Sequence, residues 1–304
     1  MNNNEDANHS FVRMLATNII DLHTKIMFSI APKYSVKHYY ERKTGRKLDL
    51  NNPKTYNEKI QWTKLYDHNP EYTLLADKLK VRDYISKEIG EQYLIPLLGY
   101  WKKFDDIDFA KLPNQFVLKC NHDCGSVVIC KDKRTFDFDH ARKKLTKSLK
   151  RNFYYGTGEW QYKNIEPYII AEKYMIDNES GDLRDYKFLC FDGEPVTCRV
   201  DFNRFDGHSR NIYDTNWNLM PFQKGKFDNY HSPVPKPDRY EEMLDITRKL
   251  SSSFPQIRVD LYLVNNEIYF GELTFTNATG IEPFFPDEYN LFFGEMWHLG
   301  DKNE

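Results

Sequence analysis

The sequence predicts an α+β fold, on three observations. Amphipathic helical segments come first, and apolar strands with interspersed helices follow, which is the order of an α+β protein. Two strand-like runs at 258–264 and 267–275 are rich in β-branched and aromatic residues and flank Asn265-Asn266, which favours a hairpin with a tight turn. The 304 residues are enough for one large domain or two modest ones.

The composition is that of a globular chain without a bias towards nucleic acid. Hydrophobic residues make up 40% and charged residues 29%, and the net charge of −2 offers no basic field for a polyanion. The first ten residues are polar, and no run approaches the roughly 18 apolar residues of a membrane span, so neither a secretory signal nor a transmembrane helix is predicted. The five cysteines, an odd number, fit free thiols in a reducing compartment, and we expect a cytoplasmic protein.

The helices are predicted from apolar positions that recur every three or four residues and from their start and stop signals. Residues 1–75 form a mostly helical region, in which Pro32 helps to end the first helix, and Gly90 stops a later helix. The predicted segments are 11–30, 51–68 (a loop that leads into a helix), 76–90, 138–151 and 240–252.

A basic and aromatic stretch, residues 33–47, follows the first helix. An apolar stripe next to basic residues fits peripheral contact with the inner face of an anionic membrane, or with a sugar or lipid-linked substrate. Packing of the stripe on the protein's own domain explains the same pattern. The sequence leaves these interpretations open.

The strands are predicted from short apolar runs bounded by turn residues. They are 94–100 (strand or loop), 115–120, a second strand after the loop NHDCGS, 167–175, the hairpin 184–191 and 195–202 about Asp192-Gly193, and the final hairpin 257–275. Residues 154–160 are glycine-punctuated and predict a mobile loop. Residues 203–238 are rich in Asn, Asp, Gly and Pro, and we expect an irregular insertion there.

The final hairpin carries charged residues inside strands that should be core. Arg258 and Asp260 share one strand face, as do Glu272 and Thr274 on the second strand. Buried carboxylates are costly unless they are paired or bound to a cation, and carboxylate oxygens with substrate phosphates suit Mg²⁺. A structural ion pair of Arg258 with Asp260 or Glu272 is the alternative interpretation.

Three further features suggest an anion or nucleotide site. Lys119 closes an apolar strand before a loop with Gly125-Ser126, where backbone N–H groups can approach an anion. Asp185 and Lys187 share a face of another apolar strand, and Glu172-Lys173 ends the strand 167–175, whose edge offers backbone groups to a flat heterocycle.

Taken in order, these features resemble the ATP-grasp superfamily and, within it, the TupA-like group of bacterial polysaccharide and teichuronopeptide biosynthesis. The resemblance runs from about residue 50 to residue 297. It implies two α+β subdomains that clamp ATP within residues 76–304, with a break near 175–185, beside a mostly helical region 1–75. The motifs that carry it are NPKTYNEKIQWTKLYD, ADKLKVRDYI, VLKCNHDCGS, GEWQYKNIEPYIIAEKYM, DYKFLCFDGEP and RVDLYLVNNEIYFGELTFT.

The resemblance also implies roles for single residues. Arg258 matches the arginine that stabilises the phosphoryl group in transfer, and we count Lys187 with it as a catalytic candidate. Asp260 and Glu272 match Mg²⁺ ligands, whereas Thr274 replaces the asparagine of the usual E-x-N, and Asn277 lies nearby. The implied nucleotide-binding residues are Lys78 and Lys119, the loop residues Gly125 and Ser126, the adenine-contacting Glu172, Lys173, Tyr174 and Met175, and the ribose-binding Asp185.

The implied activity is an ATP-dependent carboxylate–amine ligase that forms an amide through an acyl phosphate. The family context suggests that the partners are ATP, an amino acid and a uronic acid of a bacterial surface polysaccharide, such as a capsule, or of its precursor. No nucleic acid partner is expected.

Other functions are open to the sequence. A capsule or O-antigen glycosyltransferase would use the D-x-D of residues 137–139 to hold a metal and a nucleotide sugar, although this motif also fits a helix N-cap. An inactive ATP-binding scaffold would have lost its lysines or metal carboxylates, which are present. A zinc site can be drawn from Cys120, His122, Cys124 and Cys130, but these residues fall on a strand and its loop.

Overall fold

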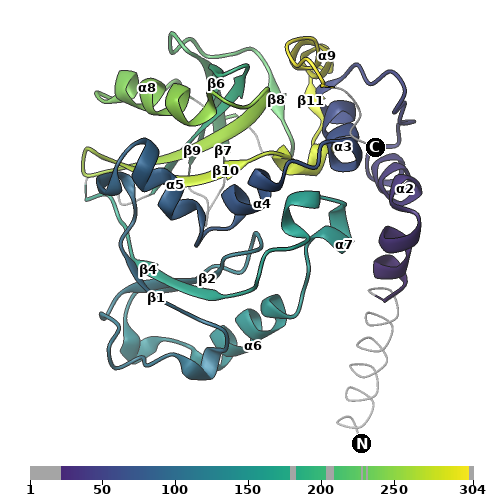
Figure 1. The fold of residues 1–304 in the computed structure, drawn as a ribbon. Coiled ribbons are helices and arrows are strands. Elements are labelled where there is room, and N and C mark those ends of the chain that lie inside the picture. The colour runs from purple at the N-terminus through teal and green to yellow at the C-terminus, as the bar shows by residue number, and fades with distance from the viewer. Residues whose placement is uncertain (1–21, 179–182, 203–208, 227–228, 231, 301–304) are drawn as a thin grey trace, which may run out of the picture.

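The computed structural model describes residues 22–178, 183–202, 209–226, 229–230 and 232–300. Figure 1 shows two sheets, with the larger sheet and α8 in the upper part and the smaller sheet and α6 in the lower part. The larger sheet is antiparallel with the order β10-β9-β5-β6-β7, and the smaller has the order β1-β4-β2-β3. The strands are β1 (Leu97–Trp101), β2 (Phe116–Cys120), β3 (Val128–Cys130), β4 (Ile169–Lys173), β5 (Arg184–Phe191), β6 (Glu194–Phe202), β7 (Ser209–Asp214), β8 (Gln223–Lys224), β9 (Gln256–Val264), β10 (Glu267–Thr274) and β11 (Phe284–Phe285).

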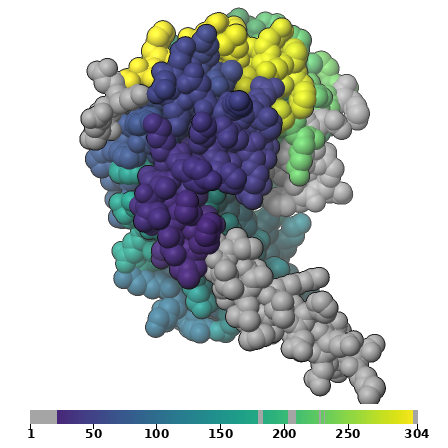
Figure 2. All heavy atoms as spheres, turned by 90° about the vertical axis from the view of Figure 1, so that its right-hand side faces the viewer, coloured from purple at the N-terminus to yellow at the C-terminus, as the bar shows by residue number. Residues whose placement is uncertain are grey.

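The helices lie around the two sheets. They are α2 (Pro32–Thr44), α3 (Tyr56–Tyr66), α4 (Pro70–Ala76), α5 (Val81–Glu88), α6 (Phe138–Leu149), α7 (Tyr154–Thr157), α8 (Tyr240–Ser251) and α9 (Glu288–Glu295). Figure 2 shows the N-terminal helices side by side with the C-terminal segment on one face of the molecule, in agreement with the contacts between α3 and α9.

The N-terminal helices follow their capping signals. Residues 22–30 are helical, the helix is interrupted at Ala31, and Pro32 occupies the first turn of α2, so the proline ends one helix and begins the next. Thr55 and Glu58 form a reciprocal capping box at the start of α3. The predicted helix at 11–30 is therefore observed where the structure describes it, from residue 22 onwards.

The helix predicted at 76–90 begins later than expected. The side chain of Asp77 accepts hydrogen bonds from the backbone N–H groups of Leu79 and Lys80, which stabilises a turn there, and α5 starts only at Val81. Gly90 adopts a φ of 112° directly after the helix, as a stop residue should. Lys78 is consequently held in a turn between α4 and α5.

The five-stranded sheet has one apolar face. Phe188, Val200 and Val259 belong to a core that also contains Ile85 of α5 and Leu244 of α8. Because side chains alternate along a strand, their neighbours in sequence lie on the opposite face. The four-stranded sheet has its own core, which it shares with α6.

One tight turn and one bulge set the register between β9 and β10 in the large sheet. Asn265 and Asn266 have φ values of 50° and 60°, the two positive values that a two-residue hairpin of type I′ requires. A bulge at Gly271 then brings Glu272 opposite Asp260. A Cβ at Gly271 would lie 3.0 Å from the backbone oxygen of Asp260 and 3.1 Å from the ring of Tyr262, which is tighter than most such contacts.

Two predictions about irregular segments are wrong. The supposed insertion 203–238 contains β7, the edge strand of the large sheet, and β8, which pairs with β11. The strand was missed because its buried positions include the polar side chains of Arg210 and Asn211. The supposed loop 154–160 contains the one-turn helix α7, which ends at Gly158 in a left-handed conformation.

Candidate active site

A band of charged side chains crosses the second face of the five-stranded sheet. Lys187 of β5 lies opposite Asp260 of β9 on one side and opposite Arg199 of β6 on the other, and Glu272 of β10 lies opposite Asp260. Farther along β6, Asp201 lies opposite Arg210 of β7. We call this set, with Asp185 and Arg258, the charged band.

Arg258 and Asp260 are the most tightly bonded members of the charged band. The guanidinium of Arg258 donates to both oxygens of Asp260, at 2.6 and 2.7 Å, and to Glu272 at 2.8 Å. The ammonium group of Lys187 donates to Asp260 and to Asp185. The structure therefore contains the ion pair that the alternative interpretation expected, on the same residues that the resemblance assigns to catalysis and metal binding.

Burial and neighbouring charges shift the pKa values of Asp260 and Arg258 in opposite directions. Burial alone would raise the pKa of Asp260, but the cationic groups of Arg258 and Lys187 outweigh it and hold that pKa well below its usual value. Burial would likewise lower the pKa of Arg258, and the carboxylates of Asp260 and Glu272 raise it above its usual value instead. Both side chains are thus ionised at neutral pH.

The candidate metal ligands form a set of oxygen donors. The carboxylates of Asp260 and Glu272 lie on neighbouring strands, and the hydroxyl of Thr274 donates to Glu272 at 3.3 Å. Two carboxylates with space for substrate phosphates are a suitable donor set for Mg²⁺. The amide oxygen of Asn277, which lies three residues beyond Thr274 in the chain, accepts a hydrogen bond from Arg258 at 2.7 Å.

The second group of predicted residues lies on the four-stranded sheet. Lys119 of β2 forms an ion pair with Glu172 of β4 at 2.6 Å, and Arg82 of α5 lies 3.8 Å from the same carboxylate. Lys173 is exposed, and Tyr174 and Met175 are half-buried just beyond the strand. The predicted hinge therefore has one buried, paired acid, Glu172, followed by accessible residues.

Lys78 is connected to the loop after β2. Its ammonium group donates to the backbone oxygen of Asp123 at 2.6 Å, and its backbone N–H donates to the oxygen of Asn121 at 3.1 Å. Asn121 in turn donates to Asp77 at 2.8 Å. The Asp-Lys pair at the turn before α5 and the loop after β2 are thus one hydrogen-bonded unit.

Gly125 and Ser126 differ in their suitability for the phosphate loop. Gly125 has a φ of 97°, and a Cβ added to it would meet no atom within 4 Å, so its backbone is accessible. The hydroxyl of Ser126 is buried, donates to Asp123 at 2.6 Å and accepts from the N–H of Cys120 at 2.8 Å. Ser126 therefore fixes the conformation of the loop from within.

Charges from both groups act on Cys124, which lies in the loop after β2. Burial raises the pKa of the Cys124 thiol first, and the carboxylates of Glu159 and Glu272 raise it further while Lys78 opposes them. Asp185, the ribose-binding candidate, forms an ion pair with Lys187, which also pairs with Asp260, and so lies in the charged band.

Two alternative functions find no support in the geometry. Asp137 accepts a hydrogen bond from the N–H of His140 at 2.9 Å and caps α6, so the D-x-D motif serves as a helix cap. Within the described ranges no group of three or more His, Cys, Asp or Glu side chains is arranged to hold a metal ion, which argues against the zinc site. The ring of His122 instead faces the backbone oxygens of Ser148 and Arg151 at 3.2 and 3.1 Å.

Sequence reasoning missed part of the charged band and one buried lysine. The missed residues are Arg199, Asp201, Arg210 and Lys224. A signal for the first two was present, because the tripeptide Arg-Val-Asp occurs both at 199–201 and at 258–260. Lys224 had no local signal.

The arrangement and the family comparison together define the class. Two antiparallel sheets, with Lys119 on a strand of one and a carboxylate-bearing hairpin in the other, form the ATP-grasp fold, and the predicted class of ATP-grasp ligases is confirmed. More narrowly, the chain belongs to the TupA-like ATP-grasp family, whose model matches residues 58–298. No curated protein matches the chain.

Several solved structures are similar over part of their length. The D-alanine–D-alanine ligase from Bacillus anthracis complexed with ATP has 16% identity and a TM-score of 0.39, over 66% of this chain and 55% of that chain. The ATP-grasp ligase PsnB complexed with its minimal precursor has 8% identity and a TM-score of 0.40, over 68% and 54%. The D-alanine–D-alanine ligase from Helicobacter pylori has 19% identity and a TM-score of 0.31, over 66% and 54%. The chain thus spans just over half the length of these structures.

Proposed function

We propose that the protein joins a carboxylate to an amine at the expense of ATP. The observation that carries the proposal is the hydrogen-bonded cluster of Arg258, Lys187, Asp260 and Glu272, in which Glu272 is the partly exposed member. Such a cluster provides cations for a phosphoryl group in transfer and anions for the metal that accompanies the nucleotide.

The proposed reaction has two steps. A carboxylate oxygen of the acid forms a bond to the γ-phosphorus while the bond to the β,γ-bridging oxygen breaks, and ADP leaves with that electron pair. The amine nitrogen then forms a bond to the carboxyl carbon of the acyl phosphate, phosphate leaves, and one proton is released. Arg258 and Lys187 stabilise the negative charge that spreads over the phosphoryl oxygens in the first step.

The remaining assignments follow from the same proposal. Asp260 and Glu272, with Thr274 as a weaker neutral donor, would hold Mg²⁺, which supplies charge neutralisation for the phosphates. Lys78, Lys119 and the backbone at Gly125 would meet the phosphates, with Ser126 shaping the loop. Residues 172–175 would contact the adenine and Asp185 the ribose. The nucleotide would bind within residues 76–304, between subdomains that divide near 175–185, and residues 1–75 would form a separate helical region.

The proposed substrates are an amino acid and a uronic acid of a bacterial surface polysaccharide, such as a capsule, or of its precursor. The support for this pairing is membership of the TupA-like family.

The experiment is an ADP-release assay with purified full-length protein, Mg²⁺ and ATP, against a matrix of amino acids and uronic acids. ADP formation that requires both an acid and an amine is expected, with a mass increase of the product that corresponds to condensation. ADP release that no acid–amine pair stimulates, or UDP release from a nucleotide sugar without ATP, would contradict the ligase.

The N-terminal helices support a second proposal, peripheral contact with the inner face of a bacterial membrane. No helix in the described ranges is long and apolar enough to cross a membrane. Leu22, Ile26 and Ile30 are nevertheless exposed at 59%, 46% and 73%, and the basic helix α2 follows them. An apolar stripe beside lysines and arginines is suited to an anionic bilayer.

Sedimentation with anionic vesicles tests this contact. Binding to phosphatidylglycerol-containing vesicles is expected, with loss of binding when Lys33, Lys37, Arg42 and Lys43 are replaced together. Unchanged sedimentation of that variant would contradict the contact and leave the ligase untouched.

A further inference from the structure

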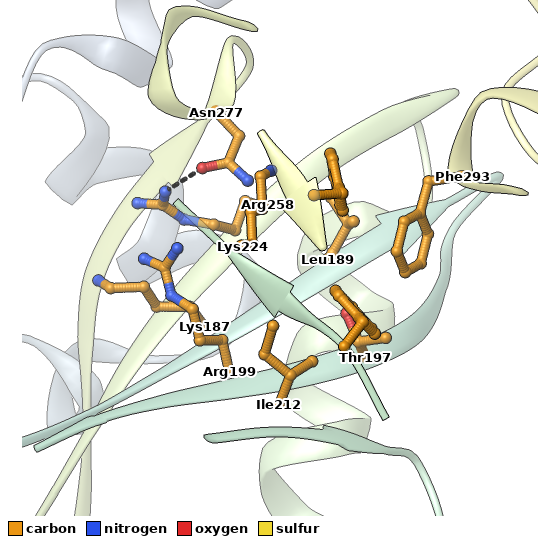
Figure 3. A pocket seen from close by; sticks show the side chains of 11 residues that line it. Lys187, Leu189, Thr197, Arg199, Ile212, Lys224, Arg258, Asn277 and Phe293 are labelled. Atoms are coloured by element: carbon orange, nitrogen blue, oxygen red, sulfur yellow. Dashed lines mark hydrogen bonds between the residues drawn. The ribbon is translucent and has the colours of Figure 1, made fainter. Parts of the chain in front are cut away.

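A small pocket lies between the charged band and the ribbon formed by β8 and β11. It encloses a space of about 30 Å³, which holds about two water-sized atoms. Figure 3 shows its two ends: the cationic side chains of Lys187, Arg199 and Arg258 lie at one, and apolar side chains such as Leu189 and Phe293 lie at the other. The pocket is therefore adjacent to the proposed phosphoryl-transfer site and shares two side chains with it.

Lys224 is the unusual member of this lining. Its side chain is only 4% exposed, and its ammonium nitrogen has no hydrogen-bond partner among the residues that the structure describes. The nitrogen lies 4.7 Å from the ring centres of both Tyr56 and Phe284, so aromatic faces are its nearest support. A buried ammonium group without a hydrogen bond lowers the stability of the fold. A bound ligand that accepts a hydrogen bond from the ammonium group offsets this loss.

The neighbouring charges do not satisfy Lys224. Arg199 donates to Asp201 at 3.3 Å, while its Nε lacks a partner among the described residues, and Arg210 engages Asp201 and Glu282 at 3.4 and 3.7 Å. Asp201 is therefore shared between two arginines, whereas Glu282 contacts Arg210 only at 3.7 Å and its Oε2 has no hydrogen-bond partner among the described residues. The pocket end of Lys224 and Arg199 has donors left over, which is the condition for binding an anion.

Burial lowers the pKa of Lys224 to about 7. Glu282 opposes that shift, whereas the positive charges of Arg199, Arg258 and Arg210 add to it. Burial and the nearby arginines both lower the pKa of Lys224. An anion in the pocket would raise that pKa again, because it would replace the lost hydration and offset the positive charges.

We propose that this pocket receives the carboxylate of the acid substrate, with Lys224 and Arg199 as its binding residues. This inference rests on the proposed ligase and adds the place where the acid is held. The space accommodates the two carboxylate oxygens but not a sugar ring, so the remainder of the acid lies outside, past the end formed by Lys187, Arg258 and Asn277. One carboxylate oxygen is held by Lys224 and Arg199, and the other points towards Lys187 and Arg258, where it attacks the phosphorus.

The experiment measures binding rather than turnover. The full-length protein is saturated with Mg²⁺ and a non-hydrolysable ATP analogue, and D-glucuronate, D-galacturonate, acetate, alanine and inorganic phosphate are titrated separately by calorimetry. We compare the wild type with Lys224→Met, Lys224→Arg and the control Lys249→Met, which removes an exposed lysine from α8.

At least one carboxylate should bind the wild type, and Lys224→Met should weaken it about tenfold or more, since a hydrogen bond to a charged group is lost. Lys224→Arg should retain most of the affinity, and Lys249→Met all of it. The affinity for the ATP analogue should stay within about twofold in every variant. Lys224→Met should also unfold at higher urea concentration at pH 7, which a merely structural lysine would not allow.

Three results would overturn the inference. They are equal carboxylate affinity in the wild type and Lys224→Met, Lys224-dependent binding of phosphate alone, and no carboxylate binding to a wild type that binds the ATP analogue. The ligase proposal fails by a different result. In that case carboxylate binding still depends on Lys224, but no acid–amine pair stimulates ADP release.

Discussion

The two faces of the five-stranded sheet are built by the same strands and have opposite chemistry. Phe188, Val200 and Val259 face the core beneath α8, whereas Lys187, Arg199 and Arg258, the residues directly before them in the chain, face the charged band. The first face stabilises the fold through apolar burial. The second holds buried charges in fixed positions at a cost in desolvation, which fits their proposed role in binding the nucleotide and its metal. The comparison predicts that substitutions on the two faces have separable effects.

The largest effect is expected at Asp260 on the charged face. Asp260→Asn removes a candidate metal ligand and should lower Mg·ATP turnover by about 10³-fold or more, while the fold is retained. Glu272→Gln should act in the same direction. ADP release gives the turnover, and far-ultraviolet circular dichroism gives the integrity of the fold. Full activity in either variant would refute the metal assignment.

The apolar face should show the opposite pattern. Phe188 is fully buried, and Phe188→Ala should lower the free energy of unfolding by about 3–5 kcal/mol through lost burial and a residual cavity. Turnover per folded molecule should stay within about twofold of the wild type at low temperature. Urea denaturation measures the first quantity, and the ADP assay, corrected for the folded fraction, measures the second.

Phe188→Leu serves as the milder control should the alanine variant fail to fold. A specific loss of turnover in a stably folded Phe188 variant would show that the two faces are coupled and that their effects on stability and turnover are not separable.

Lys224, which lies beside the charged face, should also make the stability of the protein depend on pH. Its pKa falls from 10.5 to about 7 on folding, so between these values the unfolded chain binds the extra proton. The destabilisation is fully present below pH 7 and is relieved as the pH rises towards 10.5. In the absence of acid substrate, wild-type stability should therefore rise relative to Lys224→Met over this range, by about 3–5 kcal/mol in total. Urea denaturation of both proteins at intervals from about pH 6 to about pH 10 measures the difference.

Lys64 provides the matched control. It is also buried, and burial lowers its pKa to about 8, but its ammonium group donates to Gln61 and twice to Thr279 at 2.8–2.9 Å. Lys64→Met should therefore destabilise the protein at neutral pH, whereas Lys224→Met should stabilise it. A pH-independent difference between wild type and Lys224→Met would show that Lys224 is not a buried, unsatisfied cation.

Much of the fold could be predicted because its signals are local. The turn at Asn265-Asn266 and the alternation of the final hairpin depend on adjacent residues, and the structure has both. The edge strand β7 could not be predicted, because Arg210 and Asn211 are polar at buried positions within a segment of turn-forming residues. Their burial depends on partners in other strands and in β8.

The residues of the site likewise include some that could be predicted from the sequence and some that could not. Arg258, Asp260 and Glu272 were accessible to reasoning because charges on alternate positions of an apolar strand are conspicuous. Lys224 was not, because its surroundings come from Tyr56 and Phe284, which lie far from it in the sequence. The hydroxyl of Ser126 was assigned to a phosphate loop, and only the fold shows that it is occupied by Asp123 and Cys120.

The smallest effect is expected at Thr274, where the chain departs from the E-x-N pattern of the superfamily it resembles. Its hydroxyl is already engaged with Glu272, and a hydroxyl is a weaker neutral ligand than an amide oxygen. Thr274→Asn should therefore lower the Mg²⁺ concentration for half-maximal ADP release by about two- to fivefold, and Thr274→Val should raise it. Turnover at saturating Mg²⁺ should change little in both, because the two carboxylates remain. Equal Mg²⁺ dependence in wild type, Thr274→Asn and Thr274→Val would remove position 274 from the metal site while leaving Asp260 and Glu272 in it.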